Sequence, residues 1–238
     1  MQSFLAIRPI KAISFDLDDT LYDNRPYIQK AEAKFLGFMQ QQFPAPHLWQ
    51  AAHWLATKKQ LIDAHPMLGH DTWRIREVTA ETLLLELGLN AQKAKQGAKR
   101  GLDHFLFHRS DFIVPESSLE LLAKLKKRYP LIGISNGNVD ANRIGLDEYF
   151  EFILHAGNGL RMKPESDMFD LALTRLAIKP HELLHIGDNH TADIIGARNA
   201  NCQAVWLNPA YGRHQVMKLA SPLPHIMITD IEQLAYLV

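Results

Sequence analysis

The chain has 238 residues, of which 47% are hydrophobic, and its 26 basic and 26 acidic side chains give zero formal net charge. This length suits one large domain or two small ones, and the balanced charge gives no support for binding to nucleic acid or to an anionic membrane. The single cysteine, Cys202, excludes an internal disulfide framework, and no apolar run approaches the roughly 20 residues of a membrane span. The first residues do not resemble a secretory signal, so we expect a cytoplasmic protein.

The first predicted element is a buried strand over residues 11–17, which ends in a cluster of carboxylates. Asp16, Asp18 and Asp19 lie within four residues, so their mutual repulsion calls for solvent or a cation nearby. Ligand sets made only of oxygen suit Mg²⁺. Because side chains alternate along an extended segment, we expect Asp16 and Asp18 on one side and Asp19 on the other. The alternative is an acidic strand end that merely caps a helix.

Residues 25–110 predict four amphipathic helices with short connections. Their apolar residues recur at helical spacing, and the stripe of the second helix runs through Leu55 and Ile62. Gly88 is typical of a helix stop, and Asn90 is typical of the N-cap of the fourth helix. Four such helices form a bundle. Because an α/β pattern surrounds this segment, we interpret it as an inserted cap domain.

From residue 114 onwards, strands and helices alternate. The predicted strands cover 131–135, 152–155, 183–186, 203–207 and 226–228, and the predicted helices cover 115–128, 139–146, 165–176, 191–200 and 230–237. This alternation predicts an α/β fold with a doubly wound parallel sheet. The core domain then comprises residues 1–24 and 111–238, and the four-helix-bundle cap comprises residues 25–110.

Polar residues also lie near the ends of three later segments of this core. They are Ser135, Asn136 and Gly137 after the strand 131–135, Lys163 before the helix 165–176, and Asp188 and Asp193 after the strand 183–186. A hydroxyl and backbone N–H groups at the first of these positions suit a phosphate, although a plain turn explains the same residues. Because the carboxyl ends of parallel strands meet at one edge of a sheet, all these groups can converge on Asp16. Together they form the inventory that phosphoryl transfer requires.

Four motifs in this order resemble those of the haloacid dehalogenase-like (HAD) hydrolase superfamily. They are Asp16-Leu-Asp-Asp-Thr20, Ser135-Asn-Gly137, Lys163-Pro164, and Gly187-Asp188 with Asp193. A helical cap inserted after the first motif corresponds to cap class C1 of that family. The stretches 15–26, 134–138, 149–152 and 163–168 further resemble the YigB-type phosphatases of flavin metabolism. At position 189, where some relatives carry a second Asp, this chain has Asn189, which we leave out of the metal site.

The resemblance implies a Mg²⁺-dependent phosphatase that hydrolyses FMN and 5-amino-6-(5-phospho-D-ribitylamino)uracil in riboflavin metabolism. Asp16 would attack phosphorus and form an aspartyl-phosphate, and Asp18 would act first as acid and then as base. The remaining implied roles are metal binding by Asp16, Asp18 (through its backbone carbonyl) and Asp188, phosphate binding by Ser135, Asn136 and Lys163, and orientation of Lys163 or a metal-bound water by Asp193. The expected partner is a small phosphate monoester, and the expected assembly is a monomer or a weak homodimer.

Other functions use part of the same inventory. A haloacid dehalogenase also has an Asp nucleophile, but a halide leaves without a proton, so Asp18 argues against this function. A phospho-accepting receiver module needs no large cap and fits in about half this length. A broad-specificity sugar or nucleotide phosphatase of the same family and a catalytically inactive interaction protein are further alternatives.

Several other patterns have competing interpretations. The string His181-Glu-Leu-Leu-His185 matches a zinc-protease motif, but that chemistry needs a helix and these residues lead into a predicted strand. His104 and His108 are interpreted as a surface pair. Trp73, Arg74 and Arg76 could contact a flat substrate ring, or Trp73 could pack inside the cap while the arginines are solvated.

Overall fold

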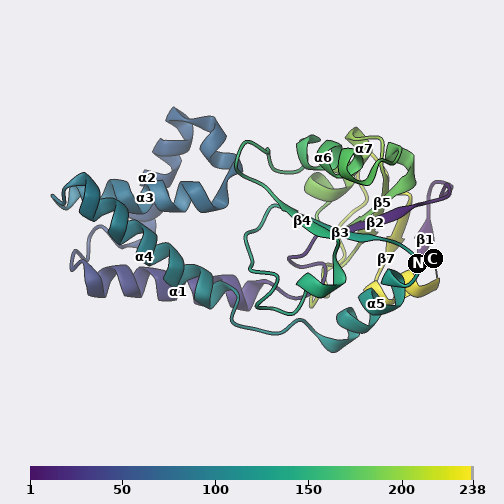
Figure 1. Ribbon diagram of the computed structural model, residues 1–238, viewed down its shortest axis with the longest axis horizontal. Coiled ribbons are helices and arrows are strands. Elements are labelled where there is room, and N and C mark those ends of the chain that lie inside the picture. The colour runs from purple at the N-terminus through teal and green to yellow at the C-terminus, as the bar shows by residue number, and fades with distance from the viewer. Residues whose placement is uncertain (237–238) are drawn as a thin grey trace.

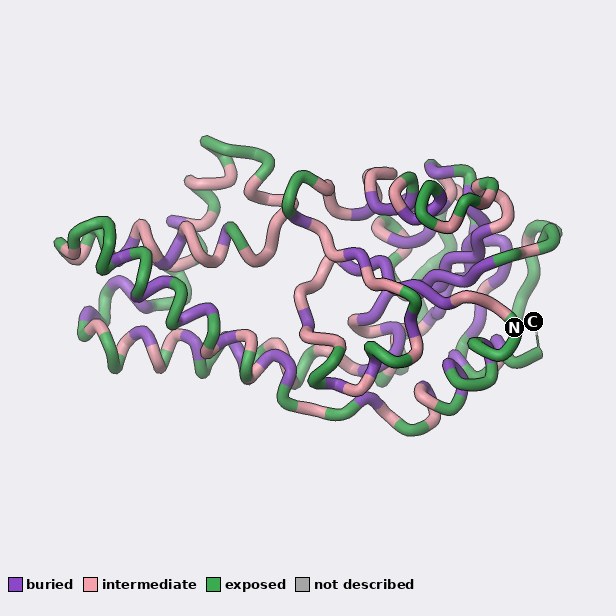
Figure 2. The backbone as a smooth tube through the Cα atoms, in the orientation of Figure 1, coloured by how far each residue is buried: buried purple, intermediate pink, exposed green. Residues whose placement is uncertain are grey.

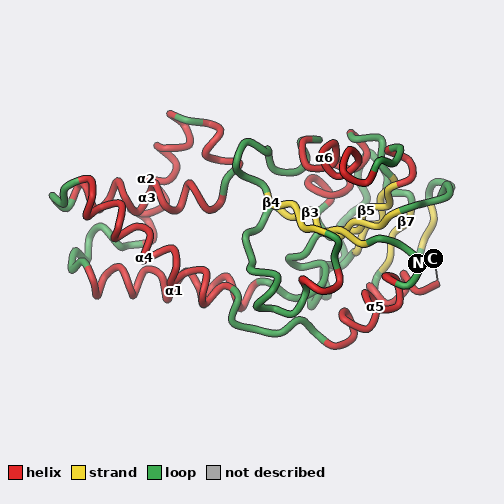
Figure 3. The backbone as a smooth tube through the Cα atoms, viewed as in Figure 1, coloured by secondary structure: helices red, strands yellow, loops and turns green. Residues whose placement is uncertain are grey.

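A seven-stranded sheet forms the centre of one half of the molecule in the computed structural model, which describes residues 1–236 (Figures 1 and 3). The strands are β1 (Gln2–Ser3), β2 (Ala12–Phe15), β3 (Leu131–Ser135), β4 (Phe152–His155), β5 (Leu183–Gly187), β6 (Gln203–Leu207) and β7 (Ile226–Ile228). They lie in the order β1-β7-β6-β5-β2-β3-β4. Strands β2 to β7 pair in parallel, and only the two-residue edge strand β1, which the sequence analysis did not predict, is antiparallel.

Strand β2 lies between β3 and β5, so the strand order reverses beside it. In an open α/β sheet, ligands bind outside the carboxyl ends of the strands at such a switch point. Asp16 directly follows β2, and Ser135 and Gly187 end the two neighbouring strands. The predicted doubly wound sheet is therefore confirmed, and its topology gathers the acidic motifs at one edge.

Two apolar layers cover the sheet, as the pattern of side chains along each strand requires. Ile13 and Phe15 of β2 belong to one buried cluster together with leucines of helix α5 (Glu116–Lys126). Ala12 belongs to the other cluster, together with residues of α6 (Asp167–Leu176) and α7 (Gly196–Asn199). Successive side chains of a strand point to opposite faces, so β2 is buried on both (Figure 2). Packing on both faces thus fixes every side chain of this strand, and the fixed strand positions Asp16, the residue that follows it.

Two predicted core helices take other forms. Residues 139–146 form successive turns instead of a helix, because Asp140 accepts the Arg143 N–H through its side chain and Gly145 has a φ of +78°. The predicted helix 191–200 begins as the π-helix η4 (His190–Ile195) before α7. Short 3₁₀ helices are η2 (Asp147–Tyr149), η3 (Pro180–Glu182) and η5 (Ile231–Tyr236), the last of which corresponds to the predicted helix 230–237, whose residue 237 lies outside the described part.

Four long helices lie at the other end of the molecule (Figure 1). They are α1 (Arg25–Gln42), α2 (Ala51–Ala64), α3 (Thr72–Glu86) and α4 (Ala91–Arg109), with the 3₁₀ helix η1 (Pro66–His70) before α3. The Asn90 side chain accepts the Lys93 N–H at 2.9 Å and Gly88 has a φ of +92°, as expected for an N-cap and a helix stop. Within residues 1–236, no helix combines the length and apolarity needed to cross a bilayer.

These helices surround an apolar cluster of their own, to which α1, α3 and α4 contribute most of the side chains. Helix α2 packs mainly against α3 and buries only Thr57. The expectation that Leu55 faces the bundle is wrong, since this residue is 60% exposed. Its helical spacing was correct, but α2 lies at the rim of the bundle, where one face has no neighbour.

We expect opposite effects from adding a methyl group to two glycines of these helices. A Cβ at Gly101 in α4 would lie 2.5 Å from Met39 Sδ and 3.0 Å from Phe35 Cε2, both buried in α1. Gly37 in α1 has no atom within 4 Å of the same position. Gly37→Ala should raise the free energy of unfolding by about 0.5–1 kcal/mol through helix propensity, whereas Gly101→Ala should lower it by about 1–3 kcal/mol through overpacking. Urea denaturation of both variants checks this, and equal effects would contradict the close approach of α1 and α4.

Candidate active site

The three acidic residues after β2 point into different surroundings. Asp16 is buried and its backbone N–H donates to Ile186 O of the neighbouring strand β5 at 2.8 Å. Asp19 has a φ of +60°, and its carboxylate accepts from the Asn24 N–H and from Arg213. Asp19 therefore holds the turn that follows the strand. Because this turn is not extended, the alternation of side chains from which we predicted its direction does not apply there.

Lys163 connects two of the predicted site carboxylates. Its ammonium is buried and donates to Asp16 Oδ1 and to Asp193 Oδ1, both at 2.7 Å, and also to Ile134 O. Burial alone would lower the pKa of Lys163, but the two carboxylates outweigh it and raise that pKa above its ordinary value. Lys163 is therefore a fixed positive charge beside Asp16 and does not act as a proton donor near neutral pH.

Asp193 has further hydrogen-bond donors besides this lysine. Its carboxylate also accepts the Asn189 N–H at 2.9 Å and a hydrogen bond from His185 Nε2 at 3.2 Å. Although burial opposes ionisation, Lys163 and His185 hold the pKa of Asp193 well below its usual range. Burial raises the pKa of Asp16 well above the ordinary value, an effect that Lys163 only partly offsets and that Asp193 and Asp188 reinforce. One positive charge thus serves two carboxylates, and Asp16 is left under-neutralised.

His185, which the sequence analysis considered only as part of a zinc motif, anchors this network. It is fully buried in β5, and burial lowers its pKa, so the ring is neutral. Its Nε2–H donates to Asp193, and its Nδ1 accepts from Ser14 Oγ of β2 at 2.9 Å. His181 lies in η3, outside the strand, so the two histidines do not share a helix and the zinc-protease interpretation is rejected.

Asp188 lies beside the same cluster, immediately after β5. Thr20 of the first motif donates to Asp188 Oδ1 at 3.0 Å, and Trp206 donates to the Asp188 carbonyl at 2.7 Å. Burial and then the charge of Asp193 raise the pKa of Asp188 to about 7. The Asn189 side chain caps the next helix by accepting the Ala192 N–H, which agrees with leaving it out of the metal site.

The second motif adjoins Lys163 through a reciprocal pair of hydrogen bonds. Asn136 Oδ1 accepts the Lys163 N–H at 2.8 Å, and Asn136 Nδ2 donates to the Lys163 carbonyl at 3.0 Å. Ser135 is buried, and its Oγ accepts the Gly137 N–H at 3.0 Å. The side chain of Asn136 therefore fastens the loop that carries Lys163, and phosphate binding by Ser135 and Asn136 stays a prediction.

Asp18 has two partners that the sequence analysis missed. Its Oδ1 accepts from Tyr22 Oη at 2.7 Å and from Arg109 Nη2, at the last residue of α4. Arg109 is 1% exposed. A basic residue at a helix end is normally solvated, so the sequence gives no sign of this pairing. Arg109 and Asp18 are 91 positions apart, and only the fold brings them together.

The carboxylates of this site fit a divalent cation. Oxygen atoms of Asp16, Asp188 and Asp193 lie within 4.8 Å of one another, and this is the one group of three or more potential metal ligands among residues 1–236. The donor set is oxygen only, and the raised pKa values of Asp16 and Asp188 report negative charge that a cation would neutralise. His104 and His108, whose ring centroids are 4.6 Å apart, belong to no such group in this part of the chain.

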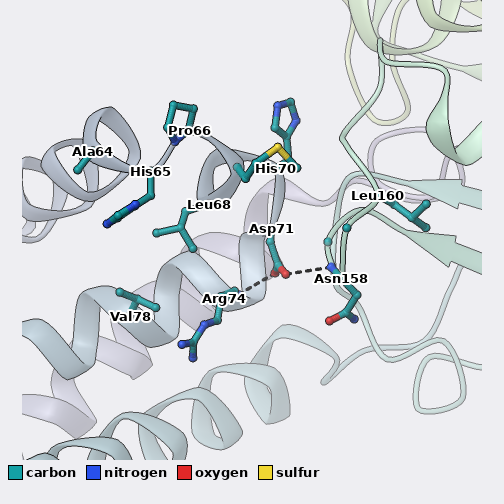
Figure 4. A pocket seen from close by; sticks show the side chains of 13 residues that line it. Ala64, His65, Pro66, Leu68, His70, Asp71, Arg74, Val78, Asn158 and Leu160 are labelled. Atoms are coloured by element: carbon teal, nitrogen blue, oxygen red, sulfur yellow. Dashed lines mark hydrogen bonds between the residues drawn. The ribbon is translucent and has the colours of Figure 1, made fainter.

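A groove of about 730 Å³ lies where the helical segment meets the core (Figure 4). Asp71 caps α3 by accepting the Arg74 N–H and also accepts the Asn158 N–H of the core at 3.2 Å. His70 Nδ1 accepts the N–H of Met162, the residue before Lys163, at 3.2 Å. Trp73 packs against the apolar cluster of the four helices. This contact favours the packing interpretation of Trp73.

A comparison with protein families places these residues in a known context. The model of the haloacid dehalogenase-like hydrolases matches residues 10–201, which is most of the chain. The chain belongs to this family. The match extends from the strand before Asp16 to the residues after α7, so it includes all four motifs.

Individual relatives of this HAD hydrolase agree with the assignment. The 5-amino-6-(5-phospho-D-ribitylamino)uracil phosphatase YigB of Escherichia coli is 37% identical over 238 residues, which is the full length of both chains. The N-acylneuraminate-9-phosphatase of Rattus norvegicus is 24% identical and covers 97% of this chain and 94% of its own. The crystal structure of a 2-haloacid dehalogenase from Pseudomonas syringae superposes with a TM-score of 0.87 at 33% identity, covering 95% of this chain and 97% of the other.

The raised pKa of Asp188 predicts how a cation and pH affect stability. Between pH 3.8 and about 7 the folded state binds more protons at Asp188 than the unfolded state, so stability falls as pH rises through that window. Without divalent cations at pH 8, Asp188→Asn should therefore raise the free energy of unfolding, by up to about 4 kcal/mol, since the pKa of Asp188 rises from 3.8 to about 7 on folding. Mg²⁺ should raise the Tm of the wild type and have much less effect on the variant.

Thermal unfolding with EDTA and with Mg²⁺ measures both effects. Asp147→Asn, at an exposed position in η2, is the matched control and should behave as the wild type in both buffers. Equal stabilisation of the wild type and Asp188→Asn by Mg²⁺ would contradict the assignment of Asp188 to the cation.

Proposed function

We propose that this HAD hydrolase is a Mg²⁺-dependent phosphatase that hydrolyses small phosphate monoesters through an aspartyl-phosphate on Asp16. The observation that carries the proposal is that two carboxylates at one strand end have different partners. Asp16 pairs with the buried ammonium of Lys163, and Asp18 pairs with Tyr22 and Arg109. Different surroundings allow two carboxyl groups to take different roles, here a nucleophile and an acid–base group.

In the first half of the reaction, a carboxylate oxygen of Asp16 forms a bond to phosphorus. The bond between phosphorus and the ester oxygen breaks, its electron pair goes to that oxygen, and Asp18 donates a proton to give the free alcohol. Lys163 holds a positive charge beside the reacting carboxylate throughout, because its position is fixed by Asp193 and Ile134 O. The Ser135 hydroxyl, which ends β3 beside this site, would donate a hydrogen bond to a phosphoryl oxygen.

In the second half, a water oxygen forms a bond to phosphorus and its proton goes to Asp18. The bond between phosphorus and Asp16 breaks and returns its electron pair to the carboxylate, so both residues regain their starting states and inorganic phosphate leaves. When bound by Asp16, Asp188 and the carbonyl of Asp18, Mg²⁺ would neutralise charge on the phosphoryl group. Asp193, which lies in the same cluster, orients Lys163.

The proposed substrates are FMN and 5-amino-6-(5-phospho-D-ribitylamino)uracil. The support for them is the full-length similarity to YigB, which carries the second compound in its name. A broad-specificity phosphatase is the alternative, since relatives named for N-acylneuraminate 9-phosphate and for glyceraldehyde 3-phosphate are 23–26% identical. We further propose that residues 25–110 act as a cap over the core of residues 1–24 and 111–238, in a cytoplasmic monomer or weak homodimer.

A dehalogenase function is the second candidate, because a solved neighbour bears that title. A halide needs no proton when it leaves, so that reaction has no use for a carboxyl group held two residues after the nucleophile. Tyr22 and Arg109, both buried, donate hydrogen bonds to Asp18 and hold it in place. Two buried donors that position a carboxyl group at this point favour the phosphatase.

Asp16→Asn should reduce phosphate release from FMN by more than about 1,000-fold, because an amide is nearly isosteric with the carboxylate but is not a nucleophile. The fold should survive, since burial makes the charged form of Asp16 costly. Phosphate release and circular dichroism measure the two effects, and Asp63→Asn, at an exposed position in α2, is the control. Activity within about tenfold of the wild type would remove Asp16 from the nucleophile role.

A substrate panel separates the candidate functions. We expect kcat/KM for FMN and for the ribitylaminouracil phosphate to exceed that for simple sugar phosphates by at least about tenfold, and we expect no halide release from 2-chloropropionate. EDTA should abolish turnover and Mg²⁺ should restore it. Similar values across all esters would indicate the broad-specificity phosphatase, and halide release without phosphate release would indicate the dehalogenase.

A further inference from the structure

We propose that Arg109, with Tyr22, is a positioning residue that orients Asp18 so that its second oxygen faces the leaving group. This inference rests on the proposed phosphatase function and assigns to it residues that the four motifs do not contain. It concerns the geometry of the acid–base group, which the motifs alone leave undetermined.

One oxygen of the Asp18 carboxylate is occupied by two donors. Tyr22 Oη and Arg109 Nη2 both donate to Oδ1, from the strand-end turn and from the end of α4 respectively. Two donors on one oxygen fix the rotation of the carboxyl plane. A half-turn about the Cβ–Cγ bond would only exchange the two equivalent oxygens, so one oxygen always faces the donors and the other is free of them. The remaining oxygen, Oδ2, is then the one available for proton transfer.

The second oxygen of Asp18, Oδ2, points towards the second motif. A methyl group at Gly137 would overlap Asp18 Oδ2, so this oxygen lies against the backbone of the second motif. The Gly137 N–H donates to Ser135 Oγ, and the Gly137 carbonyl accepts from His155 Nδ1 at 2.8 Å, which fixes that backbone. Oδ2 therefore faces the loop proposed to hold the phosphoryl group, where the ester oxygen must lie.

Burial of the Arg109 guanidinium is energetically costly. Its side chain is 1% exposed, and its Nη1 has no hydrogen-bond partner among the described residues. A buried guanidinium that uses only part of its donor set is costly, and a well-packed apolar residue would serve a purely structural role better. The single bridge to Asp18 is thus best explained by the carboxylate that it orients.

Arg109 lies where the helical segment returns to the core. It ends α4, and the next residue contacts the core, where Ser110 Oγ accepts the Asp140 N–H at 2.9 Å. Phe112 packs on Tyr22 with ring centroids 4.8 Å apart and stacks on Tyr27 at 3.9 Å. Both chain connections between the helical segment and the core therefore meet at Asp18. A displacement of the helices would move the donor that orients this carboxyl group.

The test compares kcat/KM for an alkyl ester, FMN, with that for p-nitrophenyl phosphate, whose leaving group needs no proton. This parameter covers only the steps up to release of the alcohol, so the later hydrolysis does not enter it. Arg109→Met should lower the FMN value by about 100-fold and the aryl value by less than about fivefold. Tyr22→Phe and Arg109→Lys should show the same pattern with smaller losses, and Asp18→Asn, which keeps an acceptor oxygen for both donors, should show the largest selective loss.

Arg100→Met is the matched control, because Arg100 lies on the same helix and pairs with Gln42 at the surface. It should leave both values unchanged. Equal losses on the two esters in folded Arg109→Met and Tyr22→Phe, or no loss in either, would overturn the positioning role. If Arg109→Met does not fold, Tyr22→Phe and Arg109→Lys decide alone. Failure of the wild type to release phosphate from either ester would instead refute the proposed function.

Discussion

The site depends on one buried ammonium group placed between two carboxylates. Lys163 reaches Asp16 from β2 and Asp193 from η4, and its third donor bond goes to the Ile134 carbonyl of β3. Removing such a charge would leave two buried carboxylates without compensation, which costs several kcal/mol. Because His185 continues the chain of hydrogen bonds from Asp193 to Ser14 of β2, the charge network ties together the three central strands. The same contacts that hold Asp16 therefore also connect the central strands of the sheet.

The charges of this network are not fully compensated within the protein. Lys163 and His185 lower the pKa of Asp193, whereas burial keeps the pKa values of Asp16 and Asp188 raised. A site with surplus buried negative charge is destabilising alone and becomes favourable when a cation arrives. Strained or uncompensated groups commonly concentrate where a protein works. The doubly buried sheet supplies the stability that tolerates them.

Much of this arrangement could be predicted from the sequence, for a topological reason. Asp16 and Lys163 are 147 positions apart, yet parallel strands bring their carboxyl ends to one edge whatever the length of the connections. The short-range signals at Gly88 and Asn90 were equally reliable, because they depend on local backbone chemistry. Arg109 and His185 could not be assigned in this way. Arg109 is an ordinary basic residue at a helix end, and His185 was considered only as part of a zinc motif. Only tertiary packing shows that each touches a site carboxylate.

The helical segment returns to the core beside Asp18, and this position gives Asp16 and Asp18 different partners. The two carboxylates share one strand end, so distinct roles require partners from distinct elements. The core supplies Lys163 for Asp16, and the last residue of α4 supplies Arg109 for Asp18. An insertion that returned to the core elsewhere would remove Arg109 from Asp18 and leave Tyr22 as its remaining donor. The turn held by Asp19 begins the departing chain and Arg109 ends the returning one, so both ends of the helical segment adjoin Asp18, the residue proposed as the acid–base group.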